Sequence, residues 1–183
     1  MKEYWQNYID GQFIDGGAGE IQVDNPGTGK RLADQALASE KDVDRAVEAA
    51  TRAHKSCFLT DMRPVERGRM VKKIGEYLLE KADEIAPILS KEAGKTLFEA
   101  RLEVTNAARY FEYYGNQAET LEGRSIPLGS TYYDFTTYEP YGISAQVIPW
   151  NFPMEMTARS LSTGLTTGNT CVIKTPELTP LTQ

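Results

Sequence analysis

The sequence offers very few side chains that bind transition metals. Among its 183 residues it has two cysteines, Cys57 and Cys171, and one histidine, His54. A structural zinc or iron–sulfur site needs about four such ligands close together. The sequence therefore excludes a site of this kind, and we expect no bound metal.

Positive charge and long apolar runs are scarce too. The formal net charge is −6, the pI is about 5.0 and no Lys/Arg-rich run occurs, which is atypical of a protein that binds nucleic acid. The first residues, MKEYWQNYIDG, hold no apolar run of signal-peptide length, and no segment approaches the roughly 20 apolar residues that cross a bilayer. We expect a cytoplasmic protein with no membrane or nucleic-acid partner, whose ligands are small molecules or proteins.

Glycine-rich phosphate-binding motifs are absent as well. Ala93–Thr96 reads AGKT, like the end of a P-loop, but Leu89 stands where the motif requires glycine. Gly29-Lys30 fails in the same way, because Asp24 occupies the earlier position. No G-x-G-x-x-G follows a predicted strand. The sequence thus excludes a P-loop nucleotide hydrolase, and a dinucleotide would have to be bound in another way.

What the sequence does contain is the composition of an ordinary globular protein, with 40% apolar and 25% charged residues. Residues 4–38 are rich in Gly, Asp and Asn between short apolar pieces, which predicts strands and turns, with a hairpin turn at Asp10-Gly11. Ser39 and Asp42 form a capping pair ahead of apolar residues at helical spacing, so a helix should run to about Lys55.

Two longer helices should follow. Pro64 suits the first turn of one helix, which Gly94 should end or bend. Its apolar stripe has a 3.6-residue period and comprises Met70, Ile74, Leu78, Ile85 and Leu89. A further helix is predicted from Thr96 to about Ala118, and the segment LEGRSIPLG after it is predicted to be a loop.

The second half of the chain predicts a β-arm and a βαβ unit. Thr and Tyr are concentrated in STYYDFTTYEP, residues 130–140, an extended ribbon suited to a solvent-facing or intersubunit arm. The strand ISAQVI, a helix from about Pro153 to Gly168 and the strand TCVIK then make one βαβ unit with parallel strands. Ligands bind at the carboxyl ends of such strands. Asn151, Lys174 and Glu177 should therefore lie at one edge of the sheet.

Each of these three residues has two readings. Asn151 is held between Pro149 and Pro153, and its amide can donate to an oxyanion, a contact worth roughly 2.7–4 kcal/mol. Its side-chain oxygen can equally cap the following helix, and the residues alone leave the two readings even. Lys174 and Glu177 can contact the ribose of a dinucleotide, or simply form a solvated pair at the end of a strand.

Neither cysteine is predicted to act as a nucleophile. Cys171 lies within a buried type of strand, where burial should raise the pKa of its thiol. Cys57 follows His54 by three residues, but no third group is predicted to orient such a pair. We expect both thiols to be chemically inert.

Two motifs resemble the aldehyde dehydrogenase superfamily. They are EPYGISAQVIPWNFP, residues 139–153, and GNTCVIKTPELTPLT, residues 168–182, and the spacing from Asn151 to Lys174 matches as well. The pieces YIDGQF, NPGTGK, RPVERGRM and KEAGKTLFEA extend the likeness over nearly the whole chain. The resemblance implies NAD(P)-dependent oxidation of an aldehyde to a carboxylate. A cysteine thiolate attacks the aldehyde, an asparagine amide stabilises the thiohemiacetal oxyanion, hydride passes to nicotinamide, and a glutamate activates the water that hydrolyses the thioester.

Carried over by position, the resemblance makes Asn151 the oxyanion donor. Lys174 and Glu177 become contacts of the adenosine ribose, and the Glu177 carboxylate favours NAD over NADP because it repels a 2′-phosphate. The backbone wall beside the nicotinamide ribose comprises Ile148, Pro149 and Trp150.

The resemblance also predicts a substrate channel along the helix after Asn151. Phe152, Met156 and Arg159 fall on it, and an arginine at this place resembles the semialdehyde branch, where it binds the far carboxylate of the substrate. Alternatively, Glu155 and Arg159 form an i,i+4 ion pair. The helix departs from the family at Thr163-Gly164 and Thr166, residues that lower its helix propensity.

The active site implied by the resemblance is incomplete. In the family the nucleophilic cysteine, the general-base glutamate and the glycine-rich pyrophosphate turn lie beyond position 183, and neither cysteine here matches the nucleophile motif. We therefore expect the amino-terminal part of a longer enzyme, homo-oligomeric at full length, with the 183-residue chain inactive alone.

The expected fold is α/β. Residues 1–129 and 142–183 should form a partial Rossmann-like NAD(P)-binding domain with an N-terminal β-hairpin and helices, and residues 130–141 a β-arm for oligomerisation. The catalytic domain is expected to be absent. The alternative function is a non-catalytic, truncated binding or assembly module that uses the arm to join partner chains.

Overall fold

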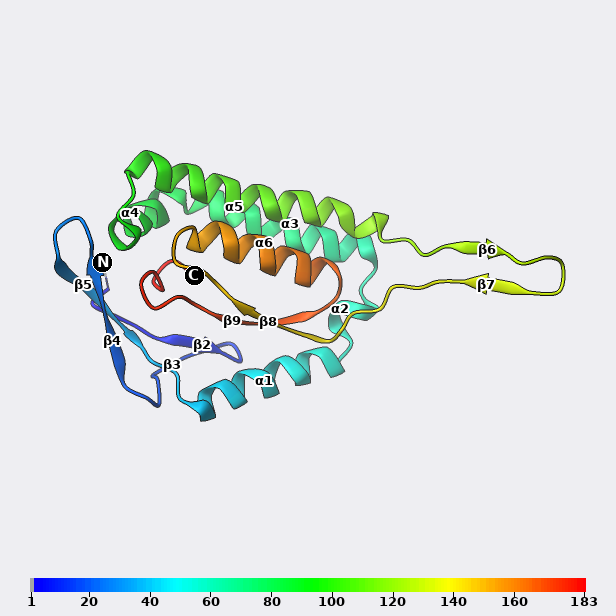
Figure 1. Cartoon of the computed structure of the whole chain (residues 1–183), viewed down its shortest axis with the longest axis horizontal. Helices are drawn as coiled ribbons and strands as arrows, with labels where there is room; N and C mark the ends of the chain where they lie inside the picture. Colours follow the sequence, from blue (N-terminus) through cyan, green and yellow to red (C-terminus); the bar gives the residue numbers. More distant parts are fainter. Residues whose placement is uncertain (1) are drawn as a thin grey trace.

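The computed structural model describes residues 2–183 as a mixed α/β body with one long projecting arm (Figure 1). The strands are β1 (Tyr4–Trp5), β2 (Asn7–Ile9), β3 (Gln12–Ile14), β4 (Glu20–Asn25), β5 (Lys30–Ala36), β6 (Ser125–Pro127), β7 (Tyr133–Phe135), β8 (Ile143–Val147) and β9 (Thr170–Lys174). The helices are α1 (Glu40–Lys55), α2 (Phe58–Asp61), α3 (Pro64–Glu80), α4 (Ala82–Ala93), α5 (Leu97–Gln117) and α6 (Pro153–Thr166), and a short 3₁₀ helix, η1 (Ala118–Thr120), follows α5. None of the helices in the described range combines the length and apolarity that a bilayer span requires.

Strands and turns dominate the first 38 residues, as predicted. β1, β5 and β4 form one sheet in that order, with β1 parallel and β4 antiparallel to β5, while β2 and β3 form an antiparallel hairpin. The hairpin turns at Asp10 and Gly11, which both have positive φ, 55° and 75°. Two consecutive left-handed residues match the twist of a hairpin, so the predicted turn is confirmed.

The helix predicted from Ser39 to Lys55 is confirmed as α1. The Ser39 hydroxyl accepts from the Asp42 N–H, and the Asp42 carboxylate accepts from the Ser39 N–H at 2.8 Å. This reciprocal capping box satisfies two backbone donors that the first helical turn leaves without partners. α5 begins with a second capping box, made by Thr96 and Glu99.

The single helix predicted from Pro64 to Gly94 is wrong in its continuity, because the chain breaks at Lys81 (φ −96°, ψ 6°) between α3 and α4. A break of one residue nearly preserves the phase of the apolar stripe, so periodicity did not reveal it. Gly94 ends α4 in the left-handed conformation with φ 70°, as predicted.

The predicted βαβ unit is confirmed and forms the centre of the body. β8 and β9 run parallel, with Ile143 opposite Thr170 and Val147 opposite Lys174. α6 connects them and packs on one face of the strands, α1 packs against them from the other side, and α3 and α5 lie beyond α6 (Figure 1).

The main core lies between the helices. α3 and α5 approach so closely that a Cβ on Gly75 would lie 2.6 Å from the Ala108 carbonyl oxygen. The buried apolar residues of this cluster are Val71, Ala86, Leu89, Ala100, Val104, Ala107, Phe111, Met154 and Ala158. Two of them belong to α6, so the core fixes the start of α6 against α5.

The unusual residues of α6 fit their surroundings. A Cβ on Gly164 would lie 2.7 Å from Cys171 Sγ, so the glycine makes room for the Cys171 side chain of β9. The Thr163 hydroxyl donates to the carbonyl oxygens of Arg159 and Ser160, within the helix. The helix therefore forms despite its low propensity, because packing against β9 determines these positions.

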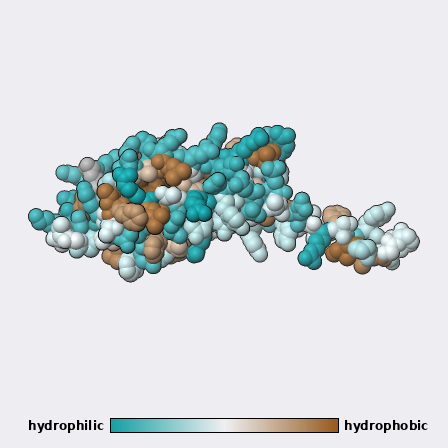
Figure 2. All heavy atoms as spheres, turned by 90° about the horizontal axis from the view of Figure 1, so that it is seen from above, coloured by the Kyte–Doolittle hydropathy of each residue, from teal (hydrophilic) through white to brown (hydrophobic). Residues whose placement is uncertain are grey.

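The arm is a β-hairpin that begins earlier than predicted. β6 and β7 pair antiparallel, with Ser125 opposite Phe135, so the segment LEGRSIPLG contributes a strand where a loop was expected. The strand was missed because it has three residues, ends at Pro127 and depends on β7 for its hydrogen bonds. The arm projects from the body, and Figure 2 shows apolar atoms gathered on it, where Leu128 and Phe135 are exposed.

Candidate active site

The carboxyl ends of β8 and β9 form the edge at which the candidate residues were expected. The Ile148 N–H donates to the Lys174 carbonyl at 3.1 Å, one residue beyond the paired strands. The segments that follow β8 and β9 therefore leave the sheet side by side, and they lead to Asn151 and to Glu177 respectively. The prediction that these residues share one edge of the sheet is confirmed.

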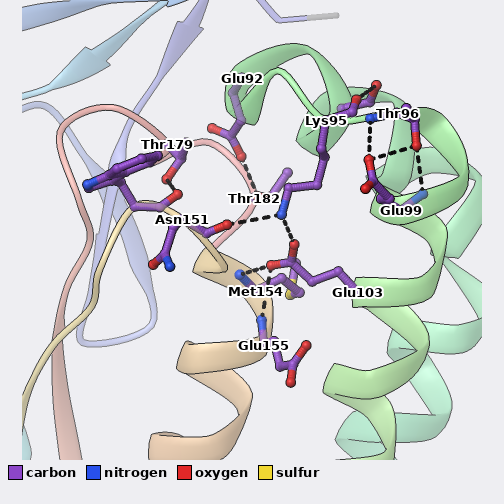
Figure 3. A network of polar contacts seen from close by, with 12 residues as sticks. Glu92, Lys95, Thr96, Glu99, Glu103, Asn151, Met154, Glu155, Thr179 and Thr182 are labelled. Carbon is purple, nitrogen blue, oxygen red and sulfur yellow. Dashed lines mark hydrogen bonds and ion pairs between the residues drawn. The ribbon is translucent and has the colours of Figure 1, made fainter.

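The backbone around Asn151 is held by side chains from distant parts of the chain (Figure 3). The Lys95 ammonium, in the turn between α4 and α5, donates to the Asn151 carbonyl oxygen at 3.1 Å. The Thr179 hydroxyl, in the segment after β9, donates to the Trp150 carbonyl oxygen at 3.1 Å. Two successive carbonyl groups are thus fixed from two directions.

The start of α6 is capped by Glu103, a residue of α5. Glu103 Oε1 accepts from the Met154 N–H at 3.0 Å and from the Glu155 N–H at 3.3 Å. The N-cap residue, Phe152, has no side-chain oxygen to serve this purpose. A carboxylate at a helix N-terminus also interacts favourably with the helix dipole.

The alternative role of Asn151 as a helix cap is therefore wrong. Within residues 2–183 its side chain makes no hydrogen bond, and it is exposed and directed away from the Lys95–Glu103 pair (Figure 3). The amide retains two free N–H donors at the mouth of the site. This geometry suits donation to a ligand.

Lys95 and Glu103 form a buried ion pair, with 13% and 1% of their side chains exposed. The Lys95 ammonium also lies over the Phe152 ring, 4.4 Å from its centroid, which is a cation–π contact. Lys95 reaches this position because Gly94 turns the chain in the left-handed conformation and Thr96 starts α5 immediately afterwards.

Glu92 of α4 is a second buried carboxylate close to the site. Its Oε2 accepts from the Leu181 N–H at 2.8 Å, and its Oε1 accepts from the Thr182 hydroxyl. Burial raises the pKa of Glu92 to about 7, although both hydrogen bonds favour the charged form. Glu92 thus anchors the segment that carries Thr179 to its contact with Trp150.

Lys174 and Glu177 form an exposed ion pair, with 52% and 66% of their side chains accessible. The hydrogen bond from Lys174 lowers the pKa of the Glu177 carboxyl group. The pair matches the solvated alternative for these residues in the absence of a ligand. Their contact with a ribose stays a prediction.

The other predicted cofactor residues differ in accessibility. Ile148 is buried, whereas Pro149 is exposed and Trp150 has 57% of its surface accessible. Trp150 therefore projects from the sheet edge beside Asn151. The proposed contact of these three residues with a nicotinamide ribose stays a prediction.

The predicted substrate residues follow one side of the first turns of α6. Phe152 and Arg159 are exposed and Met156 is half-buried. The alternative ion pair between Glu155 and Arg159 is wrong, because Glu155 Oε1 instead lies 3.5 Å from the Tyr110 hydroxyl. No ion pair of Arg159 exists within residues 2–183, so its guanidinium is available to a ligand.

A hollow of about 560 Å³ adjoins the same helix. It lies between α5 and α6 and includes Glu155 in its lining. Its other lining residues are Asn106, Arg109, Tyr110, Glu112, Tyr113, Tyr114 and Asn116. The hollow reaches the candidate site only at the first turn of α6.

The two cysteines lie away from Asn151. Cys171 stands opposite Ser144, near the amino ends of β8 and β9, and burial raises the pKa of its thiol to about 11. Cys57 is exposed between α1 and α2, with φ 57°. A thiol that ionises near pH 11 is a poor nucleophile at neutral pH, so the prediction that Cys171 is inert is supported.

The residues that support Asn151 were not predicted. Glu103 has a signal in the sequence, because it follows Ala100 by three residues and so places an acid on the buried face of α5. No local sequence pattern indicates the contacts of Lys95 and Thr179, because their partners, Asn151 and Trp150, lie 56 and 29 residues away along the chain. Only the fold brings them together.

Known proteins match nearly the whole length of this chain. The model of the aldehyde dehydrogenase family matches residues 13–183. An aldehyde dehydrogenase from Aspergillus niger is 38% identical over 175 residues, which cover 95% of this chain and 35% of the relative.

Solved structures resemble the whole chain. PnpE from Pseudomonas sp. WBC-3 is 37% identical with a TM-score of 0.92, over 98% of this chain and 37% of that one. PnpE is also known in complex with nicotinamide adenine dinucleotide. A mutant aldehyde dehydrogenase from Bacillus cereus is 31% identical with a TM-score of 0.95, over 98% of this chain and 37% of its own.

The chain spans about a third of the length of these relatives. The family model nevertheless matches nearly all of this chain, from residue 13 onward. The chain belongs to the aldehyde dehydrogenase family.

Proposed function

We propose that this chain contributes the oxyanion donor and part of the dinucleotide site to the NAD(P)-dependent oxidation of an aldehyde to a carboxylate. The observation that carries the proposal is the Asn151 side chain. It is exposed beside the carboxyl ends of β8 and β9, has no partner within residues 2–183 and is relieved of helix capping by Glu103. Membership of the family supplies the reaction class.

In this function Asn151 donates its amide N–H to the oxygen of the aldehyde as a thiolate attacks the carbonyl carbon. Negative charge develops on that oxygen, and a donor already fixed in position stabilises the charge without reorganisation. The backbone contacts from Lys95 and Thr179 provide this fixation.

The dinucleotide would be held by Lys174 and Glu177 at the adenosine ribose and by Ile148, Pro149 and Trp150 at the nicotinamide ribose. The exposed Lys174–Glu177 pair fits this role, because both side chains can exchange their mutual contact for ribose hydroxyl groups. NAD, when bound, accepts the hydride. PnpE, 37% identical to this chain, is known in complex with this cofactor.

The charge of Glu177 makes NAD the preferred cofactor over NADP. A 2′-phosphate would bring negative charge against this carboxylate. We expect higher kcat/KM with NAD, and Glu177→Gln should raise the relative efficiency with NADP. Equal efficiency of the unchanged protein with both cofactors would contradict this assignment.

The substrate is proposed to be an aldehyde with a distant carboxylate. Arg159 has no ion-pair partner within residues 2–183 and lies on the same side of α6 as Phe152 and Met156. Oxidation of succinic semialdehyde should be faster than that of a neutral aldehyde of similar length. Arg159→Leu should remove that preference while leaving the neutral aldehyde unaffected.

Replacement of Asn151 tests the main proposal. In the complete protein that carries this chain, Asn151→Ala should lower kcat for aldehyde-dependent NADH formation by about 10²–10³-fold. Asn116→Ala is the matched control, because Asn116 is exposed at the far end of α5. A variant of Asn151 with the activity of the control would rule out the oxyanion role.

The 183-residue chain alone is proposed to lack steady turnover. Cys171 lies near the amino ends of β8 and β9, with the pKa of its thiol raised to about 11, and Cys57 lies between α1 and α2. Purified isolated chain should produce no NADH above background with an aldehyde and NAD. Sustained turnover would overturn this proposal.

A second role, assembly with a further copy of the chain, is supported by the arm. Tyr133 and Phe135 of β7 have 96% and 72% of their surface exposed, and a free strand edge can pair with another strand. We propose that the arm makes the protein a homo-oligomer. Sedimentation of a variant lacking residues 124–136 should show a smaller assembly than the unchanged protein.

A further inference from the structure

Three side chains fix the segment around Asn151 without taking part in the reaction proposed above. Lys95 binds the Asn151 carbonyl, Thr179 binds the Trp150 carbonyl, and Glu103 binds two N–H groups of the next helix. They come from the α4–α5 turn, from the segment after β9 and from α5 (Figure 3). The backbone on both sides of Asn151 is therefore anchored to elements outside its own βαβ unit.

Glu103 caps the N-terminus of α6, although a helix is usually capped by the residue directly before it. The first hydrogen bond within α6 runs from the Met156 N–H to the Phe152 carbonyl at 2.9 Å, and Pro153 has no N–H. The N–H groups of Met154 and Glu155 would otherwise lack partners, and the Glu103 carboxylate accepts from both. Asn151 is thereby left free for another partner.

Lys95 links this cap to the candidate donor. One ammonium group contacts the Glu103 carboxylate, the Asn151 carbonyl and the face of the Phe152 ring. A buried ion pair rarely stabilises a protein more than apolar residues of the same volume would. The geometry of the pair, rather than its contribution to stability, is therefore the feature to explain.

We propose that Lys95 and Glu103 are positioning residues that orient the Asn151 amide. Glu103 fixes the start of α6, and Lys95 transfers that fixed position to the peptide group of Asn151. The inference rests on the function proposed above for Asn151. Loss of the contact from Lys95 should allow the peptide group to rotate, so that the amide no longer points constantly at the oxyanion.

The decisive variant is Lys95→Met/Glu103→Gln in the complete protein. It removes both charges together, keeps the size of the side chains and leaves an amide oxygen that can accept from the Met154 and Glu155 N–H groups. The cap of α6 is kept, whereas the ammonium contacts with the Asn151 carbonyl and the Phe152 ring are lost. This design avoids leaving a buried charge unpaired, which would risk unfolding in Lys95→Met alone.

We expect this double variant to lower kcat by about 10–100-fold, less than loss of the amide itself, with KM changed by less than about threefold. Lys95→Arg, which keeps the charge, should recover much of the loss. Lys91→Met is the matched control, because Lys91 is exposed on α4 and makes no ion pair within residues 2–183. A kcat within twofold of the control would overturn the proposal.

A thermodynamic cycle separates positioning from a general structural effect. If Lys95 and Glu103 act through Asn151, adding their replacements to Asn151→Ala should lower kcat no further. Independent, multiplicative losses would mean that the pair acts by another route, and would also overturn the proposal.

Hydrogen exchange tests the positioning without any turnover. The N–H groups of Met154 and Glu155 should exchange slowly in the unchanged protein and at least about tenfold faster in Glu103→Ala, relative to N–H groups inside α6. If the unchanged protein oxidises no aldehyde but this local difference is present, the proposed function fails and the positioning stands. If the Met154 and Glu155 N–H groups exchange equally fast in Glu103→Ala and in the unchanged protein, the positioning proposal is wrong, whatever the activity of the protein.

Discussion

Two lysine–glutamate pairs flank Asn151, and they differ most in their contact with water. Lys95 and Glu103 have 13% and 1% of their side chains exposed, whereas Lys174 and Glu177 have 52% and 66%. Lys95 and Glu103 each have further partners, whereas the side chains of Lys174 and Glu177 pair only with each other within residues 2–183. Similar chemistry therefore gives a rigid support on one side of the site and groups available to a ligand on the other.

The pKa of a carboxyl group also shifts in opposite directions at the buried and the exposed positions. The pKa of Glu92 is raised to about 7 because burial disfavours its charge, while the pKa of Glu177 is lowered because Lys174 donates to it in the open. Glu92 and Glu103 both point their oxygens at backbone N–H groups near the site. The buried carboxylates thus hold the backbone, and the exposed one is free to exchange partners.

Breaking the buried pair should have the largest effect on the free energy of unfolding. Glu103→Ala leaves the Lys95 ammonium buried without its partner and removes the cap of α6. We expect a loss of about 3–5 kcal/mol, which urea denaturation monitored by circular dichroism would measure. Glu177→Ala serves as the exposed counterpart and should change the same quantity little.

The apolar replacement Lys95→Met/Glu103→Leu sharpens this comparison. Removing both charges should recover much of the stability lost in Glu103→Ala, because no charge is left unpaired. Losses equal to that of the single variant would contradict the view that the unpaired charge is the main cost.

The raised pKa of Glu92 predicts that the free energy of unfolding depends on pH, with an effect of intermediate size. Its pKa is about 7 in the folded protein against an ordinary value of 4.5, so the folded state retains a proton that the unfolded chain has already lost between these pH values. The free energy of unfolding should therefore fall as pH rises from 4.5 to 7, by about 3 kcal/mol in total, and this contribution should stay constant at higher pH.

Glu92→Gln should remove this contribution. Its stability should match that of the unchanged protein near pH 4.5 and exceed it at pH 8, because a neutral amide has no charge to bury. Denaturant unfolding of both proteins at several pH values gives the difference directly. A difference that does not vary with pH would show that Glu92 is not protonated in the folded state in this range.

The sequence predicted those parts of the site that depend on local pattern. Parallel strands, the helix after Pro153 and the shared edge of Asn151 and Glu177 all followed from hydrophobic runs and from the rule that ligands bind at carboxyl ends. The break at Lys81 did not follow, because a one-residue interruption leaves the helical period nearly unchanged.

The support of Asn151 lay outside the reach of such patterns. Its role as a helix cap was excluded by Glu103, whose partners Met154 and Glu155 lie 51 and 52 residues further along the chain. A propensity or a motif describes neighbours in sequence, whereas this cap is a tertiary contact. Lys95 lies in the rejected P-loop motif AGKT and in the family-like piece KEAGKTLFEA, and neither predicts its contact with the Asn151 carbonyl, which depends on the packing of α5 against α6.

Breaking the exposed pair should have the smallest effect on stability and an effect on ligand binding. Lys174→Met should change the free energy of unfolding by no more than about 1 kcal/mol, since solvent-exposed ion pairs contribute little. It should nevertheless weaken NAD binding several-fold in the complete protein, measured by calorimetric titration, because the ammonium no longer meets the ribose. Lys81→Met is the matched control, as Lys81 and Glu84 form an i,i+3 pair on the protein surface, between α3 and α4. Equal NAD affinity in the two variants would mean that Lys174 and Glu177 form only a surface ion pair with no role in cofactor binding. The exposed pair would then differ from the buried pair in solvent accessibility alone.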